Sequence, residues 1–285
     1  MHSLWMVLAS LLFALMGACV KLGAGRYSPA ELVFYRGFVS LVLLYAFIRF
    51  RRLPLATVHW RAHGARGVSG FFSLVAYFYA ISKLPLATAV TLNYTSPLFL
   101  AVILVTWARE RLRPALVAAV LVGFVGVALL LRPSFAQSQI LAGLMAVASG
   151  LFAAMAYYNV RQLGGLGEPE WRVVFYFSLL SALGGLAWVL GAGGFRAVDG
   201  EGALLLLGVG GFGALAQLAM TRAYRHGKTL ATAGLAYSTV VFSSLIGVLL
   251  WGETLPLPSL LAVALIVASG VLASYWSRAE PTEQD

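Results

Sequence analysis

Long apolar segments follow one another through almost the whole of this 285-residue chain, and they constrain its fold more than any other feature. A helix rises about 1.5 Å per residue, so about 20 apolar residues cross the hydrocarbon layer of a membrane. Such segments lie at 4–22, 29–48, 64–82, 86–107, 115–131, 139–160, 171–190, 203–222, 229–251 and 258–276. The connections are too short for a soluble domain, so we expect an all-α integral membrane protein with ten transmembrane helices.

A repeated tetrapeptide indicates that the chain contains an internal duplication. Leu-Ala-Thr-Ala occurs at 86–89 and again at 230–233, and each copy begins an apolar segment. Five segments in each half form an odd number, which forces the second half to insert in the opposite orientation. We therefore predict two inverted five-helix repeats, residues 1–135 and residues 136–285, the second ending in a short cytoplasmic tail. Inverted repeats are common among alternating-access transporters.

The formal net charge of +10 is explained by membrane topology without a nucleic-acid partner. Most Lys and Arg residues fall at one set of segment ends, and cytoplasmic ends are the ones enriched in positive charge. Arg66 belongs to this set, whereas Arg36 lies about two turns inside the second segment. We expect both termini to be cytoplasmic and the protein to be embedded in the lipid bilayer of a bacterial inner membrane.

The residue patterns of membrane enzymes are incomplete in this sequence. Residues 67–70, Gly-Val-Ser-Gly, resemble the nucleophile motif of an intramembrane serine protease. A serine nucleophile needs a base, however, and the four histidines fall in connections or near the termini. The chain also lacks the His-Glu-x-x-His pattern of zinc enzymes. We therefore expect a protein that is not an enzyme and has no catalytic residue, metal ion or cofactor.

Several polar and aromatic side chains lie deep inside the expected segments, where they need hydrogen-bond partners or a wet cavity. The fourth and ninth segments carry matched stripes of hydroxyl residues at helical spacing. Each residue alone is more readily explained by a hydrogen bond between helices, but the matched stripes favour a cavity for the set. The predicted substrate-cavity residues are Tyr77, Tyr79, Thr91, Asn93, Tyr94, Tyr157, Gln217 and Tyr237.

Four further residues are predicted to act in gating or in structure. Pro97 removes a backbone hydrogen bond in the middle of the fourth segment and should kink it. Gly123 and Gly211 permit close contact or sliding between helices. Arg36 is compatible with two roles: it attracts a carboxylate or phosphate, or it ties helices together through backbone carbonyls. The sequence favours the second role.

The acidic residues are notable for being absent from the middle of the segments. A proton-coupled carrier generally needs a protonatable side chain at depth, such as Asp, Glu or His. Glu31 and Glu253 lie near the predicted outer mouth and are the only substitutes that the sequence offers. We therefore expect transport without coupling to protons.

Three short motifs resemble those of the drug/metabolite transporter superfamily, in its EamA type. Residues 109–114, Arg-Glu-Arg-Leu-Arg-Pro, precede a Gly-Phe-Val-Gly stretch at 123–126. Residues 252–256, Gly-Glu-Thr-Leu-Pro, form the second copy, and residues 34–37, Phe-Tyr-Arg-Gly, match the second span of that family. The resemblance covers residues 4–276 and is greatest to the YddG-type exporters of aromatic amino acids and toxic cations.

The resemblance implies an exporter of amino acids, aromatic or neutral, of related small metabolites or of flat cations. Alternating access would carry this cargo through a central cavity. A nucleotide-sugar or sugar-phosphate carrier of the same superfamily is an alternative, and it would need more than one buried cation for the phosphates. A membrane scaffold or receptor that transports nothing is a second alternative, and it would not need polar stripes.

Overall fold

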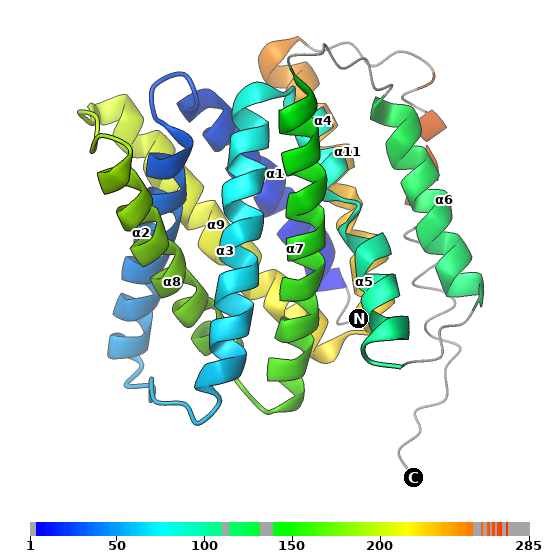
Figure 1. Ribbon diagram of the computed structural model, residues 1–285, viewed down its shortest axis with the longest axis horizontal. Coiled ribbons are helices and arrows are strands. Elements are labelled where there is room, and N and C mark those ends of the chain that lie inside the picture. The colour runs from blue at the N-terminus through cyan, green and yellow to red at the C-terminus, as the bar shows by residue number, and fades with distance from the viewer. Residues whose placement is uncertain are drawn as a thin grey trace.

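The computed structural model describes residues 4–109, 114–131 and 139–252, together with scattered residues between 258 and 272, and the regular secondary structure of this part is entirely helical. Figure 1 shows them as one bundle of long helices. The first half contributes α1 (Trp5–Gly23), α2 (Pro29–Phe50), α3 (Trp60–Lys83), α4 (Leu86–Asn93), α5 (Ser96–Thr106) and α6 (Pro114–Leu131). The second half contributes α7 (Ile140–Gly165), α8 (Glu170–Gly191), α9 (Gly200–His226), α10 (Thr229–Ala236) and α11 (Ser238–Trp251).

Six helical stretches of the described residues are long and apolar enough to cross a membrane: α1, α2, α7, α8, α9 and the combined stretch of α10 and α11. Helix α3 is 24 residues long but carries Arg61 and Arg66 in its first two turns, and α5 is a shorter apolar helix. The expected all-helical membrane architecture is thus confirmed. The count of ten spans and the division at residue 135 stay predictions, and most of the expected tenth segment lies outside the described residues.

The helices pack in pairs that combine the two halves of the chain. Helix α1 packs against α9, α2 against α8, and α3 against α7, which stand side by side in Figure 1. Glycines bring α2 and α8 close together: a Cβ on Gly37 would lie 2.6 Å from the backbone nitrogen of Ala182, and one on Gly185 would lie 2.7 Å from the Cα atom of Phe34. The two halves are therefore interleaved along their length.

Two of the expected spans are interrupted near the centre of the bundle. Helix α4 ends at Asn93 and α5 begins at Ser96, while α10 ends at Ala236 and α11 begins at Ser238. Pro97 lies in the first turn of α5, where its missing N–H group leaves no helical hydrogen bond unmade. The second interruption, at Tyr237, has no proline and was not expected. Backbone breaks at membrane depth are tolerated where they are enclosed by protein or line a cavity.

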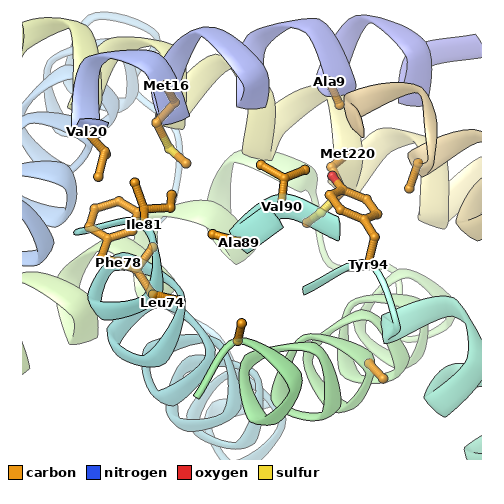
Figure 2. Close-up of a cluster of buried hydrophobic side chains, with 14 of the residues drawn as sticks. Ala9, Met16, Val20, Leu74, Phe78, Ile81, Ala89, Val90, Tyr94 and Met220 are labelled. Atoms are coloured by element: carbon orange, nitrogen blue, oxygen red, sulfur yellow. The ribbon is translucent and has the colours of Figure 1, made fainter. Parts of the chain in front are cut away.

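The largest hydrophobic core lies between α1, α3, α4 and the second-half helices. Figure 2 shows Met16 and Val20 of α1 facing Phe78 and Ile81 of α3. All four side chains are almost completely buried. This packing fixes the helices that surround the interruption at Tyr94.

Candidate functional site

A small cavity lies at the centre of the bundle, beside the interruption between α4 and α5. Its volume is about 70 Å³, enough for a few water molecules but well below the roughly 300–1,000 Å³ of typical small-molecule sites. Seven helical elements and the interruption itself supply its walls. The lining residues are Phe13, Met16, Arg36, Arg66, Gly70, Ser73, Leu74, Tyr77, Asn93, Tyr94, Ala153, Ala156, Tyr157, Phe177 and Gln217. A metabolite could enter only if the surrounding helices moved apart.

Tyr94 connects the two interrupted helices. It is the residue that follows α4, and its hydroxyl donates a hydrogen bond of 2.6 Å to the Oγ1 atom of Thr239 in α11. Both residues are buried. The ring of Tyr94 also lies 6.4 Å, centroid to centroid, from the ring of Tyr237 at the other interruption. The two breaks are therefore in direct contact across the two halves of the chain.

Two other polar contacts fix the wall formed by α7. Asn93 donates from Nδ2 to the Ser149 hydroxyl over 2.7 Å, and the Ser73 hydroxyl donates to the Ser149 carbonyl over 2.9 Å. Tyr157 of α7 stacks on Tyr224 of α9, with ring centroids 5.1 Å apart. These contacts give the cavity rigid aromatic and amide surfaces.

Two buried arginines provide the charge of the cavity. Arg36 of α2 and Arg66 of α3 are 1% and 2% exposed, and their guanidinium carbons lie 4.5 Å and 4.1 Å from the ring centre of Phe177. Arg66 donates from Nη2 to the Oε1 atom of Gln217 over 2.9 Å. An arginine at membrane depth costs about 3 kcal/mol or more, and one desolvated aromatic face returns about 2 kcal/mol of this. The aromatic face of Phe177 therefore compensates only part of the cost of two cations.

The position of Arg66 corrects the sequence analysis, which placed it at a cytoplasmic helix end and regarded Arg36 as the one charge inside the bundle. The lining residues Arg66, Gly70, Ser73 and Tyr77 follow one another at helical spacing on α3. That stripe is visible in the sequence and would have identified Arg66. It was missed because charge near a segment end is usually solvated.

The structure brings together five of the eight predicted cavity residues: Tyr77, Asn93, Tyr94, Tyr157 and Gln217. Tyr79 is half-buried against the hydrophobic core, and Tyr237 is fully buried with its hydroxyl 3.5 Å from the Val120 carbonyl; neither lines the cavity. Thr91 belongs to α4, but its side chain lies outside the described part.

The residues predicted to act in gating or structure fall in different surroundings. A Cβ on Gly123 would lie 2.6 Å from the ring of Tyr237, so this glycine allows α6 to approach the second interruption. A Cβ on Gly211 would have no neighbouring atom within 4 Å, so this glycine is not needed for a close helix contact. It lies on an apolar outer groove. Arg36 keeps Nε and Nη1 without a hydrogen-bond partner among the described residues, so these atoms tie no helices together.

The described carboxylates all lie toward the ends of the bundle. Glu31 is 1% exposed and completes a capping box with Ser28, while its Oε1 atom accepts a hydrogen bond of 2.7 Å from the Arg196 backbone N–H. Both of its oxygens are therefore engaged in local structure. Glu253, the other predicted mouth carboxylate, lies outside the described residues. Among those described, no group of His, Cys, Asp and Glu could hold a metal ion.

A buried ionic cluster joins two connections at one end of the bundle. Glu168, between α7 and α8, accepts hydrogen bonds from the Thr57 hydroxyl and from Nη1 of Arg172, the latter over 2.9 Å. His63 Nε2 lies 3.3 Å from the same carboxylate. Burial alone would raise the pKa of Glu168, but these contacts outweigh it and hold the pKa below its usual value.

Two wider grooves lie on the outside of the bundle. One, of about 610 Å³, is lined by residues of α3, α5 and α7, and the other, of about 740 Å³, by residues of α1, α2, α8 and α9. Exposed apolar side chains such as Phe72 and Leu215 form their walls. Such surfaces are typical of helices that face lipid, so the central cavity is the better candidate for a polar cargo.

The chain is similar to known membrane transporters. Residues 1–132 match the EamA-like transporter family. The pseudopaline exporter CntI of Pseudomonas aeruginosa is 32% identical over 266 residues, which cover 93% of this chain and 90% of that protein. A riboflavin transporter of Vibrio cholerae is 27% identical over 280 residues, covering 96% and 93%.

A solved crystal structure shares the fold. It covers 96% of this chain and 96% of its own chain with a TM-score of 0.79, at 23% sequence identity. At this identity the similarity concerns the arrangement of the helices alone. The names of these relatives cover different cargoes, so the comparison shows a transporter family and not one substrate.

Proposed function

Because the chain belongs to the EamA-like transporter family, we propose that it is a bacterial inner-membrane exporter of amino acids and related small metabolites, working by alternating access. One observation carries this proposal: a polar and aromatic cavity lies at the contact between two interrupted helices. Interrupted helices at the midplane are a recurrent feature of transporter binding sites. In this proposal both termini are cytoplasmic and the helices rock around the cavity.

The aromatic lining supports a cargo with a flat or apolar part. Tyr77, Tyr94 and Tyr157 present rings to the cavity, and Asn93 adds an amide. Rings of this kind accept an aromatic amino acid, the cargo suggested by the resemblance to YddG-type exporters. Flat cations fit less well, because two buried arginines would repel them. A scaffold or receptor would have no need for a polar cavity at this depth.

A carrier of sugar phosphates or nucleotide sugars is a second candidate, and one observation favours it. Such a carrier needs more than one buried cation, and the cavity holds both Arg36 and Arg66. The export direction proposed here follows the pseudopaline exporter, whose name states that direction.

Counterflow in liposomes tests the proposed function. Purified protein is reconstituted into liposomes that are each loaded with one unlabelled amino acid from a panel. The same amino acid is then added outside in labelled form, and its uptake is followed. We expect exchange that protein-free liposomes lack, and a loss of it in Tyr94→Ala and Tyr157→Ala. Tyr79→Ala is the matched control, since Tyr79 lies on the same bundle but outside the cavity. Exchange of glycerol 3-phosphate in the absence of any amino-acid exchange would favour the second candidate instead.

A further inference from the structure

The guanidinium groups of Arg36 and Arg66 have unused hydrogen-bonding capacity at the central cavity. Nε and Nη1 of both residues are buried and have no hydrogen-bond partner among the described residues. None of the ion pairs in that part of the chain includes either arginine. A guanidinium group has only donors, so these atoms need an acceptor inside the cavity, either water or an oxygen atom of a bound cargo.

We propose that Arg36 and Arg66 together form an anion site, and that the cargo carries two acidic groups, carboxylates or a phosphate. The planar fork of a guanidinium group matches the two oxygens of a carboxylate or phosphate. Phe177 lies under both groups and holds them against one ring. This inference rests on the transporter role in the proposed function, and within the related small metabolites named there it favours acidic metabolites over neutral amino acids as the cargo.

The surroundings of the two arginines are built to hold their side chains at the cavity. Gly70 lies one turn after Arg66, and a Cβ there would collide with Nη1 of Arg66 and lie 2.7 Å from the Phe177 ring. A Cβ on Gly213 would lie 3.3 Å from Nε of Arg36. Gln217 accepts a hydrogen bond from one nitrogen of Arg66 and leaves the others for a ligand. The guanidinium positions are therefore defined before a ligand arrives.

The charge of the cavity also indicates why one acidic group is not enough. A zwitterionic amino acid brings an ammonium group, and the described lining contains no carboxylate that could receive it. Two cations in a medium of low dielectric constant would repel that group. A ligand with two acidic groups instead neutralises both arginines, and its hydrocarbon part can lie against Tyr77 and Tyr157.

A charge series on a single carbon skeleton tests this site. Glutarate, its monoamide and its diamide are doubly charged, singly charged and neutral, and their binding to the purified protein in neutral detergent is measured by calorimetry. We expect affinity to fall at each step of the series. Arg36→Gln and Arg66→Gln should each weaken glutarate binding about tenfold or more, the effect of removing a charged hydrogen bond. Arg61→Gln is the control, since it removes an arginine of the same helix outside the cavity.

A second pair of variants displaces Arg66 without removing its charge, and thermal unfolding of every variant in the same detergent shows which of them remain folded. Gly70→Ala should displace Arg66 and weaken glutarate binding, whereas Gly64→Ala has nothing within 4 Å of its Cβ and should not. Glycerol 3-phosphate, compared with glycerol, shows whether a phosphate satisfies the site as carboxylates do.

The outcomes separate this inference from the proposed function. Three results would overturn the anion site. They are equal binding of glutarate and its diamide, absence of glutarate binding, and an equal loss of affinity for glutarate and for its diamide in the arginine variants. Neutral amino-acid counterflow that persists in Arg36→Gln and Arg66→Gln would leave the transporter intact and also overturn the site. Charge-dependent binding without any counterflow would support the site and contradict the proposed function.

Discussion

The hydroxyl of Tyr94 makes a side-chain hydrogen bond between the two interrupted helices. Its hydrogen bond to Thr239 is 2.6 Å long and buried. We expect Tyr94→Phe and Thr239→Val each to lower the free energy of unfolding by about 1 kcal/mol, the usual net value of such a bond. The double variant should lose little more than either single one, because both remove the same interaction.

Unfolding in detergent, followed by heat or denaturant, measures these differences. Ser82→Ala is a suitable control, since its hydroxyl bonds only to a carbonyl of its own helix, Tyr79. Fully additive losses in the double variant would show that Tyr94 and Thr239 act independently. Tyr94→Phe should also slow transport if the two breaks must move together.

Gly70 and Gly64 form a matched pair on α3. A methyl group at Gly70 meets Arg66 and Phe177, whereas one at Gly64 meets nothing within 4 Å. We expect Gly70→Ala to destabilise the protein by about 1–3 kcal/mol, the usual cost of overpacking, with little change or a small gain for Gly64→Ala. Thermal unfolding of the two variants in the same detergent makes the comparison. Similar stability in both would mean that Arg66 can move aside freely.

The cavity residues show how far depth in a segment predicts function. Tyr77 and Tyr79 are equally deep, but residues two apart on a helix point about 200° from each other, so only one of them can face the cavity. Tyr77 lines it and Tyr79 packs against the core. Asn93 and Tyr94 are adjacent yet both line the cavity, because the helix ends between them. The prediction of Tyr79 rested on its depth in the segment, and depth does not show which face of a helix a residue occupies.

The two helix breaks were also only partly predictable from the sequence. Pro97 made a disturbance of the fourth segment predictable, although the break precedes the proline and falls at Tyr94 and Thr95. The break at Tyr237 has only Gly234 upstream as a local signal, and a glycine in a helix is usually tolerated. Tyr237 lies against Tyr94 across the bundle, a tertiary contact that no local pattern reveals.

The cluster around Glu168 joins the connection before α3 to the connection before α8, and it should make stability depend on pH. The folded-state pKa of Glu168 is held below its ordinary value of 4.5. Its contribution is therefore fully present above about pH 5 and is lost as the pH falls through the lower folded-state value. We expect Glu168→Gln to cost about 1–3 kcal/mol at neutral pH, because it removes the charged partner of the partly exposed Arg172, and to flatten the acid loss.

Unfolding measured from neutral pH down to about pH 3 tests this expectation. Glu201→Gln is the control, since Glu201 pairs with Arg26 at a largely exposed position and should contribute little. Acid sensitivity that is unchanged in Glu168→Gln would place its origin at another group.

Helices from the two halves of the chain pair with one another across the bundle. Helices α1 and α9 pack together, as do α3 and α7, while α2 and α8 share one interface of glycines. Hydropathy predicted the helices well, because burial in lipid depends on composition. It could not predict these neighbours, because an apolar helix gives the same signal whichever helix lies beside it. The repeat of Leu-Ala-Thr-Ala restricts the choice only if the halves are related by symmetry.

The charge of the cargo determines how the membrane potential acts on its transport. A doubly charged anion leaves the cell along the inside-negative potential, which contributes about 2.3 kcal/mol per charge at 100 mV. For two charges, this potential can sustain a concentration of the anion outside that is roughly a thousandfold or more above the concentration inside. Such an exporter needs no proton, in agreement with the position of the described carboxylates at the ends of the bundle. Potassium gradients with valinomycin impose the potential on liposomes that contain the protein.

We expect an inside-negative potential to accelerate glutarate efflux, with a smaller effect on its monoamide and none on its diamide. A pH gradient imposed at zero potential should drive no accumulation. Glu31→Gln should behave like the unaltered protein in both assays, because the oxygens of Glu31 already serve the capping box and the Arg196 backbone. Accumulation that follows the pH gradient and disappears in Glu31→Gln would instead identify a proton-coupled carrier, with that carboxylate as its coupling site.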